Sequence, residues 1–290
     1  MEKQTLLSIE NLSVTFGSGA RAFRAVDGVS LKVNAGEVLA VVGESGSGKS
    51  VSMMALMGLL PDSAAISADK LVFDGQNLQT LSARDKRKII GKDISMIFQD
   101  AMTSLNPSFT VQMQIGEVLK THLGLRGAAV KQRILALLDL VEIPDAKNRL
   151  NVYPHQLSGG MSQRVMIAMA LACGPEWLIA DEPTTALDVT VQQQILDLIA
   201  DLVDEHQMSL ILISHDLGVI SQNADRMLVM YGGSVVESGS TEQVFDHMAH
   251  PYTRGLLAAR PRVAGLHSQA GARLQTIPGT VPELADLPAG

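Results

Sequence analysis

The stretch Gly43-Glu44-Ser45-Gly46-Ser47-Gly48-Lys49-Ser50 has the spacing G-x-x-x-x-G-K-[ST]. It follows the apolar run 38–42 and precedes a Met- and Leu-rich segment, an order that predicts strand, loop and helix. Small residues there let the backbone curl around a polyphosphate, and the N–H groups and helix N-terminus attract its charge. We expect Lys49 to reach the β- and γ-phosphates and Ser50 to ligate Mg²⁺. A dinucleotide-binding loop fails because Val51 stands where its third glycine should be, and a plain glycine-rich βα turn is the alternative.

Two adjacent carboxylates follow the apolar run 177–180. The run predicts a buried strand, so Asp181 and Glu182 come at its end. Asp181 is placed to hold Mg²⁺ beside the glycine loop, and Glu182 to polarise a water for in-line attack on a γ-phosphate. Adjacent acids at a strand end also occur in solvated turns, so this interpretation depends on the glycine loop upstream.

Two further polar residues follow predicted strands: Gln99 after the run 94–98, and His215 shortly after the run 210–213. Ligands of open α/β sheets bind at the carboxyl ends of the strands. Gln99 could therefore touch Mg²⁺ or the attacking water, and His215 could contact the γ-phosphate. A surface glutamine and a capping or surface histidine are the alternatives.

A second anion cradle is predicted at Ser158-Gly159-Gly160, which runs into the helical segment 165–172. A hydroxyl, backbone N–H groups and a helix N-terminus together attract negative charge. The chain thus carries two predicted phosphate sites, although a glycine-rich loop or helix cap would explain the second stretch taken alone.

The adenine ring of a bound nucleotide would need a contact of its own, because a phosphate loop does not hold it. An aromatic residue just after an upstream edge strand can stack on the ring. Phe16 is the candidate, taken to follow such a strand. An ordinary core phenylalanine is the alternative.

Alternation of apolar and polar residues predicts half-buried strands across residues 6–42. A helix is expected over 51–60. Residues 111–150 are expected to be mostly helical, with clear apolar spacing over 118–125 and 131–141, and to form a helical subdomain inserted between strands. A hairpin is predicted about Gly232-Gly233, and Thr184 to Asp188 should start a helix with capping residues. From residue 250 onward Pro and Gly punctuate an appendage outside the core.

Composition limits the class of protein. The chain has 290 residues, of which 46% are hydrophobic, and a formal net charge of −7, which argues against a broad nucleic-acid footprint. Apolar runs such as 165–173 are far shorter than the roughly 18 residues that span a bilayer. The first residues lack the shape of a signal peptide, so we expect the chain to stay in the cytosol. Its single cysteine, Cys173, excludes an intramolecular disulfide and is expected to be a buried core thiol.

Together these motifs resemble the nucleotide-binding subunit of ATP-binding cassette (ABC) importers over nearly the whole chain. The matching segments are the Walker A loop 43–50, Gln99 of the Q-loop, the signature 157–161 with Met161 in place of its usual Gln, the Walker B strand 178–181, the catalytic Glu182, the D-loop 186–188 with Asp188, and the switch His215. Within that superfamily, residues 96–107, 158–171, 250–253 and 277–279 resemble the peptide and nickel importer group, and 153–166 most resembles its dipeptide-importing members.

This resemblance implies an α/β fold: a P-loop NTPase with a RecA-like core sheet, an antiparallel β subdomain and the inserted helical subdomain. The ATPase domain would cover 1–250, with the helical subdomain at about 105–172, and a peptide-importer extension would cover 251–290. It implies hydrolysis of ATP with Mg²⁺, and nucleotide contacts from Asp188 as well as the two cradles. It also implies a head-to-tail dimer in which the cradle 158–160 of one ATPase subunit, a copy or more plausibly a paralogue, meets the Walker A loop of the other.

The implied partners beyond that dimer are two transmembrane permease subunits, and indirectly a periplasmic solute-binding protein, at the cytoplasmic face of a bacterial inner membrane. The cargo is left open between dipeptides, longer peptides, nickel and haem. A soluble cassette protein of DNA repair or ribosomes is the rival, but such proteins usually carry two cassettes or a long coiled coil.

Two departures from the group's pattern matter. Ala101 replaces a common proline and is expected only to loosen a loop. Group members usually continue into a cysteine-rich stretch that can ligate an iron–sulfur cluster, and the sequence stops before it, so no cluster is expected in the chain as given.

Overall fold

The computed structural model describes residues 4–185 and 187–258, and the chain divides into two compact units. The glycine-loop unit comprises Gln4–Val33, Val38–Asn77 and, of the segment that begins at Ile213, the described part to residue 258. The helical unit comprises Asn34–Glu37 and Leu78–Leu212. We describe each unit by itself.

The first sheet of the glycine-loop unit has the strand order β2-β1-β5-β6, and β4 pairs with β1. Strands β4 and β5 both pair with β1 in antiparallel orientation, and β1 is buried continuously from Leu6 to Ile9 and again at Leu12 and Val14. Its elements are β1 (Thr5–Phe16), β2 (Phe23–Asn34), β4 (Ala65–Ser67), β5 (Lys70–Phe73), β6 (Gln76–Asn77) and the 3-10 turn η1 (Gly19–Arg21). The expected edge strand before Phe16 is therefore wrong, because β1 has neighbours on both sides.

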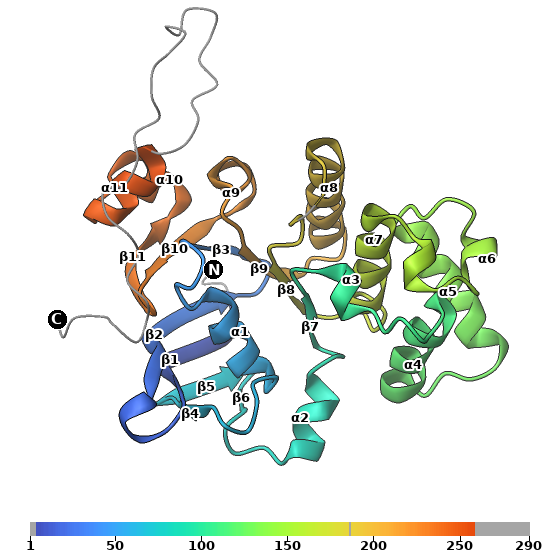
Figure 1. Ribbon diagram of the computed structural model, residues 1–290, viewed down its shortest axis with the longest axis horizontal. Helices are drawn as coiled ribbons and strands as arrows, with labels where there is room; N and C mark the ends of the chain where they lie inside the picture. The colour runs from blue at the N-terminus through green and yellow to red at the C-terminus, as the bar shows by residue number, and fades with distance from the viewer. Residues whose placement is uncertain (1–3, 186, 259–290) are drawn as a thin grey trace, which may run out of the picture. The chain divides into compact units, whose positions relative to one another are not determined.

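The second sheet of this unit supports the glycine loop. Strand β10 pairs in parallel with β3 and antiparallel with β11, with a bulge between Val229 and Met230. Figure 1 shows α10 and α11 beside β10 and β11, and the core beneath includes Val42, Val244 and Tyr252. The elements are β3 (Val38–Val42), α1 (Lys49–Met57), α9 (Leu217–Asn223), β10 (Arg226–Tyr231), β11 (Ser234–Ser240), α10 (Thr241–Asp246) and α11 (Pro251–Ala258). The hairpin predicted about Gly232-Gly233 is confirmed.

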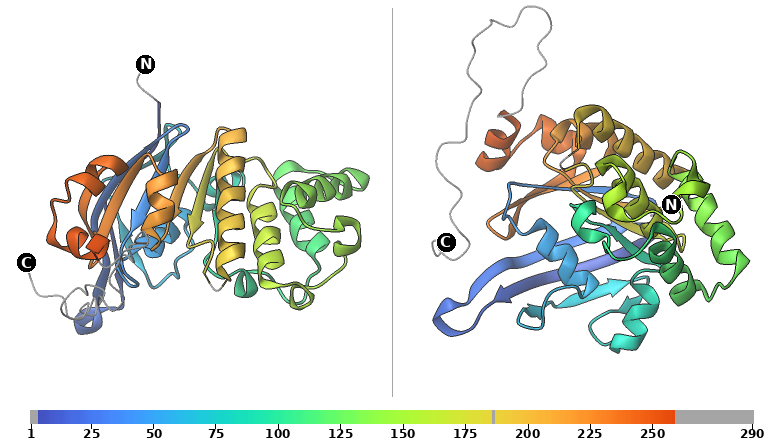
Figure 2. Two further views of the ribbon diagram at one scale, coloured as in Figure 1. Left: turned by 90° about the horizontal axis from the view of Figure 1, so that it is seen from above. Right: turned by 45° about the vertical axis from the view of Figure 1, so that its right-hand side comes forward.

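The helical unit has buried strands in the order β9-β8-β7, and β7 and β8 run parallel. Helices α4 to α7 gather into a bundle beside them (Figure 2). The strands are β7 (Ile94–Ile97), β8 (Trp177–Asp181) and β9 (Ser209–Ile213). The helices are α2 (Ala83–Ile89), α3 (Ala101–Ser104), α4 (Val111–Leu123), α5 (Ala128–Leu140), α6 (Ala146–Arg149), η2 (Pro154–Gln156), α7 (Gly159–Ala170) and α8 (Val189–Glu205).

Several local expectations are corrected. The segment 111–150, expected to be mostly helical, contains α4, α5 and α6, and α4 begins at Val111 because Thr110 caps it by accepting from Met113 N–H. Ala101 begins helix α3 behind the Asp100 cap rather than lying in a loose loop. Cys173 is half-buried instead of fully buried, and burial raises the pKa of its thiol.

The predicted domain boundaries stay predictions. Helices α4 to α7 fall within the expected helical subdomain of about 105–172, whereas most of the extension 251–290 lies outside the described residues. Within the part of the chain that the structure describes, no helix combines the length and apolarity needed to cross a bilayer.

Candidate nucleotide-binding site

The glycine loop joins the buried strand β3 to helix α1, as its sequence predicts. Gly48 caps the helix in a left-handed conformation, and Lys49 is its first residue. The Lys49 side chain is only 5% exposed, and its ammonium group donates to the carbonyl oxygens of Gly43 at 2.8 Å and Glu44 at 2.9 Å. The loop therefore curls around its own lysine.

Two glycines of this loop are required by its geometry. A Cβ at Gly43 would collide with the carbonyl oxygen of Met230 on β10, and one at Gly48 would lie 2.8 Å from the carbonyl oxygen of Ala25. At Gly46 the backbone is also left-handed (φ +81°), but a Cβ would meet nothing within 4 Å. The loop is thus packed on the strand side and open on the other. A curled backbone around a buried ammonium, open on one side, fits a polyphosphate.

The carboxylate pair lies at the end of β8 in the helical unit. Asp181 is the last strand residue and is 4% exposed. Glu182 follows in a left-handed conformation (φ +44°), and its Oε2 accepts from Gln99 Nε2 at 2.9 Å and from Thr185 Oγ1 at 3.2 Å. The structure thus brings Gln99 and Glu182 together across 83 residues. Their meeting at one sheet edge follows from the parallel pairing of β7 and β8.

Thr185 is a residue that the sequence interpretation missed. It entered only as part of a capping segment, whereas its hydroxyl donates to the Glu182 carboxylate. The sequence signal that could have identified it is a hydroxyl residue three positions after Glu182, close enough for its side chain to reach the carboxylate. Gln99 and Thr185 hold one oxygen of Glu182 from two sides, so the carboxylate has a fixed orientation.

The second cradle is the start of helix α7. Ser158 is its N-cap and accepts from Met161 N–H at 3.3 Å, and Gly159 and Gly160 are its first two residues. Ser158 and Gly159 are exposed. A Cβ at Gly159 would lie 3.3 Å from Leu187 Cδ2, which places the helix start against the segment that Asp188 ends. Asp188 caps α8 by accepting from Val191 N–H at 3.0 Å, as predicted for that segment.

His215 and Phe16 belong to the glycine-loop unit, as do Lys49 and Ser50, whereas Gln99, Asp181 and the second cradle belong to the helical unit. His215 is exposed in the turn between β9 and α9. Phe16 is half-buried at the end of β1, and its ring stacks on Phe23 with centroids 5.6 Å apart. One face of the Phe16 ring is therefore already covered by this chain.

Comparison with known families decides the class of protein. The profile described as ABC transporter matches residues 26–185, and the one described as oligopeptide/dipeptide transporter, C-terminal region, matches residues 236–290. The chain belongs to the ABC transporter family. The resemblance expected from its motifs is confirmed, and so is the expected class of enzyme, an ABC transporter ATPase.

Curated ABC transporter relatives match along almost the entire chain. The dipeptide transport ATP-binding protein DppD of Haemophilus influenzae is 53% identical over 98% of this chain and 85% of its own length. DppD of Escherichia coli K12 is 52% identical over 98% of this chain and 86% of its own length. DppD of Bacillus subtilis is 50% identical over 100% of this chain and 85% of its own length.

Solved ABC cassettes share the fold. The ATP-binding cassette MJ0796, described as dimeric in a post-hydrolysis state bound to ADP and Pi, superposes with a TM-score of 0.70 at 28% identity, covering 81% of this chain and 98% of that one. The protein cbiO1 from Clostridium perfringens superposes with a TM-score of 0.69 at 26% identity, covering 85% of this chain and 92% of that one. The expected P-loop ATPase fold with an antiparallel β subdomain is thus confirmed.

Proposed function

We propose that this chain is the ATP-hydrolysing subunit that powers the import of dipeptides or other short peptides through a membrane permease. The observation that carries the proposal is the 50–53% identity to DppD proteins over at least 98% of the chain, including the oligopeptide/dipeptide C-terminal region. The site residues supply the chemistry that an ATPase needs.

The glycine loop 43–50 binds the phosphates of ATP, with Lys49 neutralising the β- and γ-phosphate charge. Ser50, Asp181 and Gln99 are the oxygen ligands proposed for Mg²⁺, and that ion would neutralise charge on the phosphates in the transition state. Asp181 supports its part by its position, because it is the last residue of β8 and supplies a carboxylate, the kind of oxygen ligand that Mg²⁺ binds. Phe16 would offer its free ring face to adenine.

Glu182 is the proposed general base. Gln99 and Thr185 donate to the same carboxylate oxygen, and this orients the carboxylate that would accept a proton from the attacking water. His215 is proposed to contact the γ-phosphate, and Asp188 to contribute from the start of α8.

The second cradle is proposed to serve another subunit's nucleotide. Ser158, Gly159 and Gly160 lie at the N-terminus of helix α7, and Ser158 and Gly159 are exposed, a geometry suited to the phosphates of an ATP held by a partner cassette. In a head-to-tail dimer with a second copy or a paralogue, ATP would close the interface and hydrolysis would open it.

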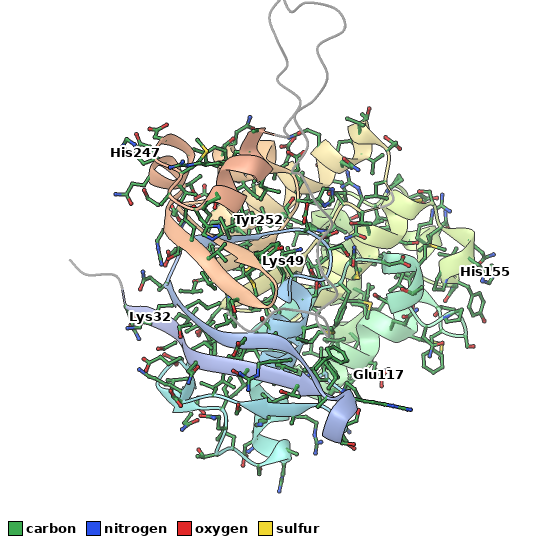
Figure 3. The ribbon with its side chains drawn as sticks, turned by 60° about the vertical axis from the view of Figure 1, so that its left-hand side comes forward. Lys32, Lys49, Glu117, His155, His247 and Tyr252 are labelled. Atoms are coloured by element: carbon green, nitrogen blue, oxygen red, sulfur yellow. The ribbon has the colours of Figure 1, made fainter. Side chains whose placement is uncertain are left out.

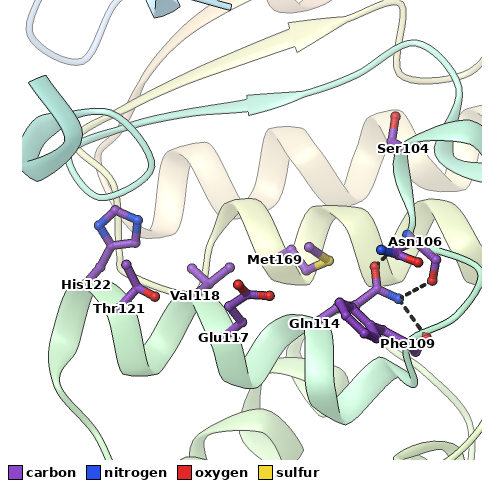
Figure 4. Close-up of a pocket in the computed structure, with 9 residues that line it drawn as sticks. All are labelled: Ser104, Asn106, Phe109, Gln114, Glu117, Val118, Thr121, His122 and Met169. Carbon is purple, nitrogen blue, oxygen red and sulfur yellow. Dashed lines mark hydrogen bonds between the residues drawn. The ribbon is translucent and has the colours of Figure 1, made fainter. Parts of the chain in front are cut away.

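Contact with the permease is proposed at the helical unit. A pocket of about 340 Å³ lies between the segment after Gln99 and helix α4, and it is lined by Phe109, Gln114 and His122 among others (Figure 4). Gln114 holds the segment in shape by donating to the carbonyl oxygens of Asn106 and Phe109. Exposed Met102, Phe109 and Met113 offer apolar surface nearby to a permease loop. This would place the chain peripherally at the cytoplasmic face of the inner membrane, with a periplasmic binding protein delivering the solute.

The proposal is tested by uptake of a labelled dipeptide into cells that lack the native gene and carry a variant copy. Wild type should restore uptake, and Glu182→Gln should not, because loss of the general base lowers turnover by about 10²- to 10⁴-fold. Glu182→Gln should still bind ATP and should form a dimer with it on a sizing column. The exposed Glu205→Gln at the end of α8 is the matched control and should behave as wild type.

Two results would contradict the proposal separately. ATP turnover by Glu182→Gln above a tenth of the wild-type rate would reject Glu182 as the base. Restored uptake of nickel or haem, without restored uptake of dipeptide, would reject the cargo.

A further inference from the structure

Tyr252 lies on helix α11 and touches the glycine loop (Figure 3). Its hydroxyl oxygen accepts a hydrogen bond from the backbone N–H of Glu44 at 2.9 Å, across 208 residues of sequence. Both residues belong to the glycine-loop unit. Glu44 is the second residue of the loop, so the contact reaches the point where the chain turns away from β3.

The hydrogen bond acts on the peptide group that holds Lys49. The N–H of Glu44 and the C=O of Gly43 belong to the same peptide unit, and that C=O accepts from the Lys49 ammonium at 2.8 Å. The three groups form a chain from Lys49 through the peptide to Tyr252. Hydrogen bonds in such a chain polarise and strengthen one another. The Tyr252 hydroxyl therefore fixes the plane of the peptide against which Lys49 rests.

Tyr252 is itself held firmly. Its side chain is 8% exposed and packs against Tyr231 with ring centroids 4.7 Å apart. Burial raises the pKa of its hydroxyl, which keeps the group protonated at neutral pH. The two residues Ala249 and His250, shortly before Tyr252 in the chain, donate their N–H groups to the Glu237 carboxylate on β11, at 2.8 Å and 3.0 Å. The segment is thus tied to β11 before it reaches the loop.

We infer that Tyr252 is a positioning residue for ATP binding: its hydroxyl pre-orders the Gly43–Glu44 peptide and the Lys49 ammonium, and so links the C-terminal segment to nucleotide affinity. The inference rests on the proposed ATPase function. A loop that is already ordered loses less freedom when it binds phosphate, so the bond should act on affinity more than on the chemical step.

The test is Tyr252→Phe in the full chain, which removes the hydroxyl and keeps the ring. Loss of one hydrogen bond of this kind should weaken the binding of Mg-ATP by about three- to tenfold, measured as the Kd by calorimetry. The kcat at saturating ATP, measured in the assembled transporter, should stay within about twofold. Hydrogen exchange at the Glu44 amide should accelerate, while exchange in β3 stays unchanged.

Tyr231→Phe is the matched control, because it removes a hydroxyl from the other ring of the pair and should leave the Kd unchanged. An unchanged Kd in Tyr252→Phe, or an equal rise in both variants, would overturn the inference. Unchanged Glu44 amide exchange would overturn it even if Tyr252→Phe were less stable. Failure of the wild-type chain to bind Mg-ATP would instead overturn the proposed function.

Discussion

The two glycine-containing cradles of this chain are built in opposite ways. In the loop 43–50, Gly43, Gly46 and Gly48 all have positive φ, and the Lys49 side chain is buried at the centre. In the second cradle, Gly159 and Gly160 are ordinary first-turn helical residues, and Ser158 and Gly159 are exposed. The first is a loop that curls around its own buried lysine, whereas the second is an exposed helix start.

This difference explains why glycine is present in each place. In the first loop it is needed for the backbone conformation and for close packing on Met230 and Ala25. At the start of α7 the backbone conformation does not require glycine, but a Cβ at Gly160 would lie 2.9 Å from Val191 Cγ1, so glycine there allows close packing on α8. The exposed helix start fits the proposal that the second cradle serves a nucleotide held by a partner subunit.

The largest expected effect is on Mg-ATP binding, where substitutions in the two cradles should differ. Lys49→Ala should weaken Mg-ATP binding to the isolated chain by roughly 10- to 100-fold, because it removes charge-assisted hydrogen bonds. Ser158→Ala should leave this affinity within about twofold and yet lower turnover in the dimer. Calorimetry on dilute protein and turnover at high protein concentration measure the two effects. Equal losses of affinity in both variants would mean that the cradles serve one nucleotide within one subunit.

A smaller effect is expected on the free energy of unfolding, where glycine substitutions in the two cradles should differ. Gly43→Ala should destabilise the chain by about 1–3 kcal/mol, because the backbone is left-handed and the new Cβ meets the Met230 carbonyl oxygen. Gly159→Ala should change stability by less than about 1 kcal/mol, since alanine is the better helix former and Leu187 Cδ2 lies at 3.3 Å from the new Cβ. Urea midpoints of the two variants give the comparison, which fails if Gly159→Ala proves the more damaging.

The smallest effect concerns Glu237, whose carboxylate ties the segment before α11 to β11 in the glycine-loop unit. Burial works against ionisation of Glu237, but the nearby Thr253 and the N–H groups of Ala249 and His250, which donate to the carboxylate, outweigh it and hold its pKa below the ordinary value of 4.5. A depressed folded-state pKa means that its stabilisation is complete above pH 4.5 and is lost as the pH falls through the folded-state value.

Glu237→Gln should therefore lower stability at pH 7 by roughly 0.5 kcal/mol, a small value because water screens this half-exposed group. Thermal midpoints of variant and wild type should converge as the pH drops from 5 to 3. A gap that persists at pH 3 would show that the carboxylate charge is not its source.

Much of the fold and site was predictable because the signals are local. The glycine loop, the cap at Ser158 and the acids after β8 each follow from residue types within a few positions of one another. The meeting of Gln99 with Glu182 followed from one rule about parallel strands, although their hydrogen bond did not.

What could not be predicted depends on pairing between distant segments. Periodicity marks Leu7 to Phe16 as a strand, but it does not reveal that β4 and β5 both pair with β1 and remove its edge. The contact from Tyr252 to Glu44 likewise requires β11, α10 and α11 to fold back onto the loop.

At Glu182 the left-handed backbone lowers the stability of the fold, while the side chain is the one proposed for catalysis. A non-glycine residue there carries a cost of about 1–2 kcal/mol that glycine would avoid. Glu182→Gly would remove this cost together with the hydrogen bonds from Gln99 and Thr185, so any heat resistance gained there would be gained without the proposed general base.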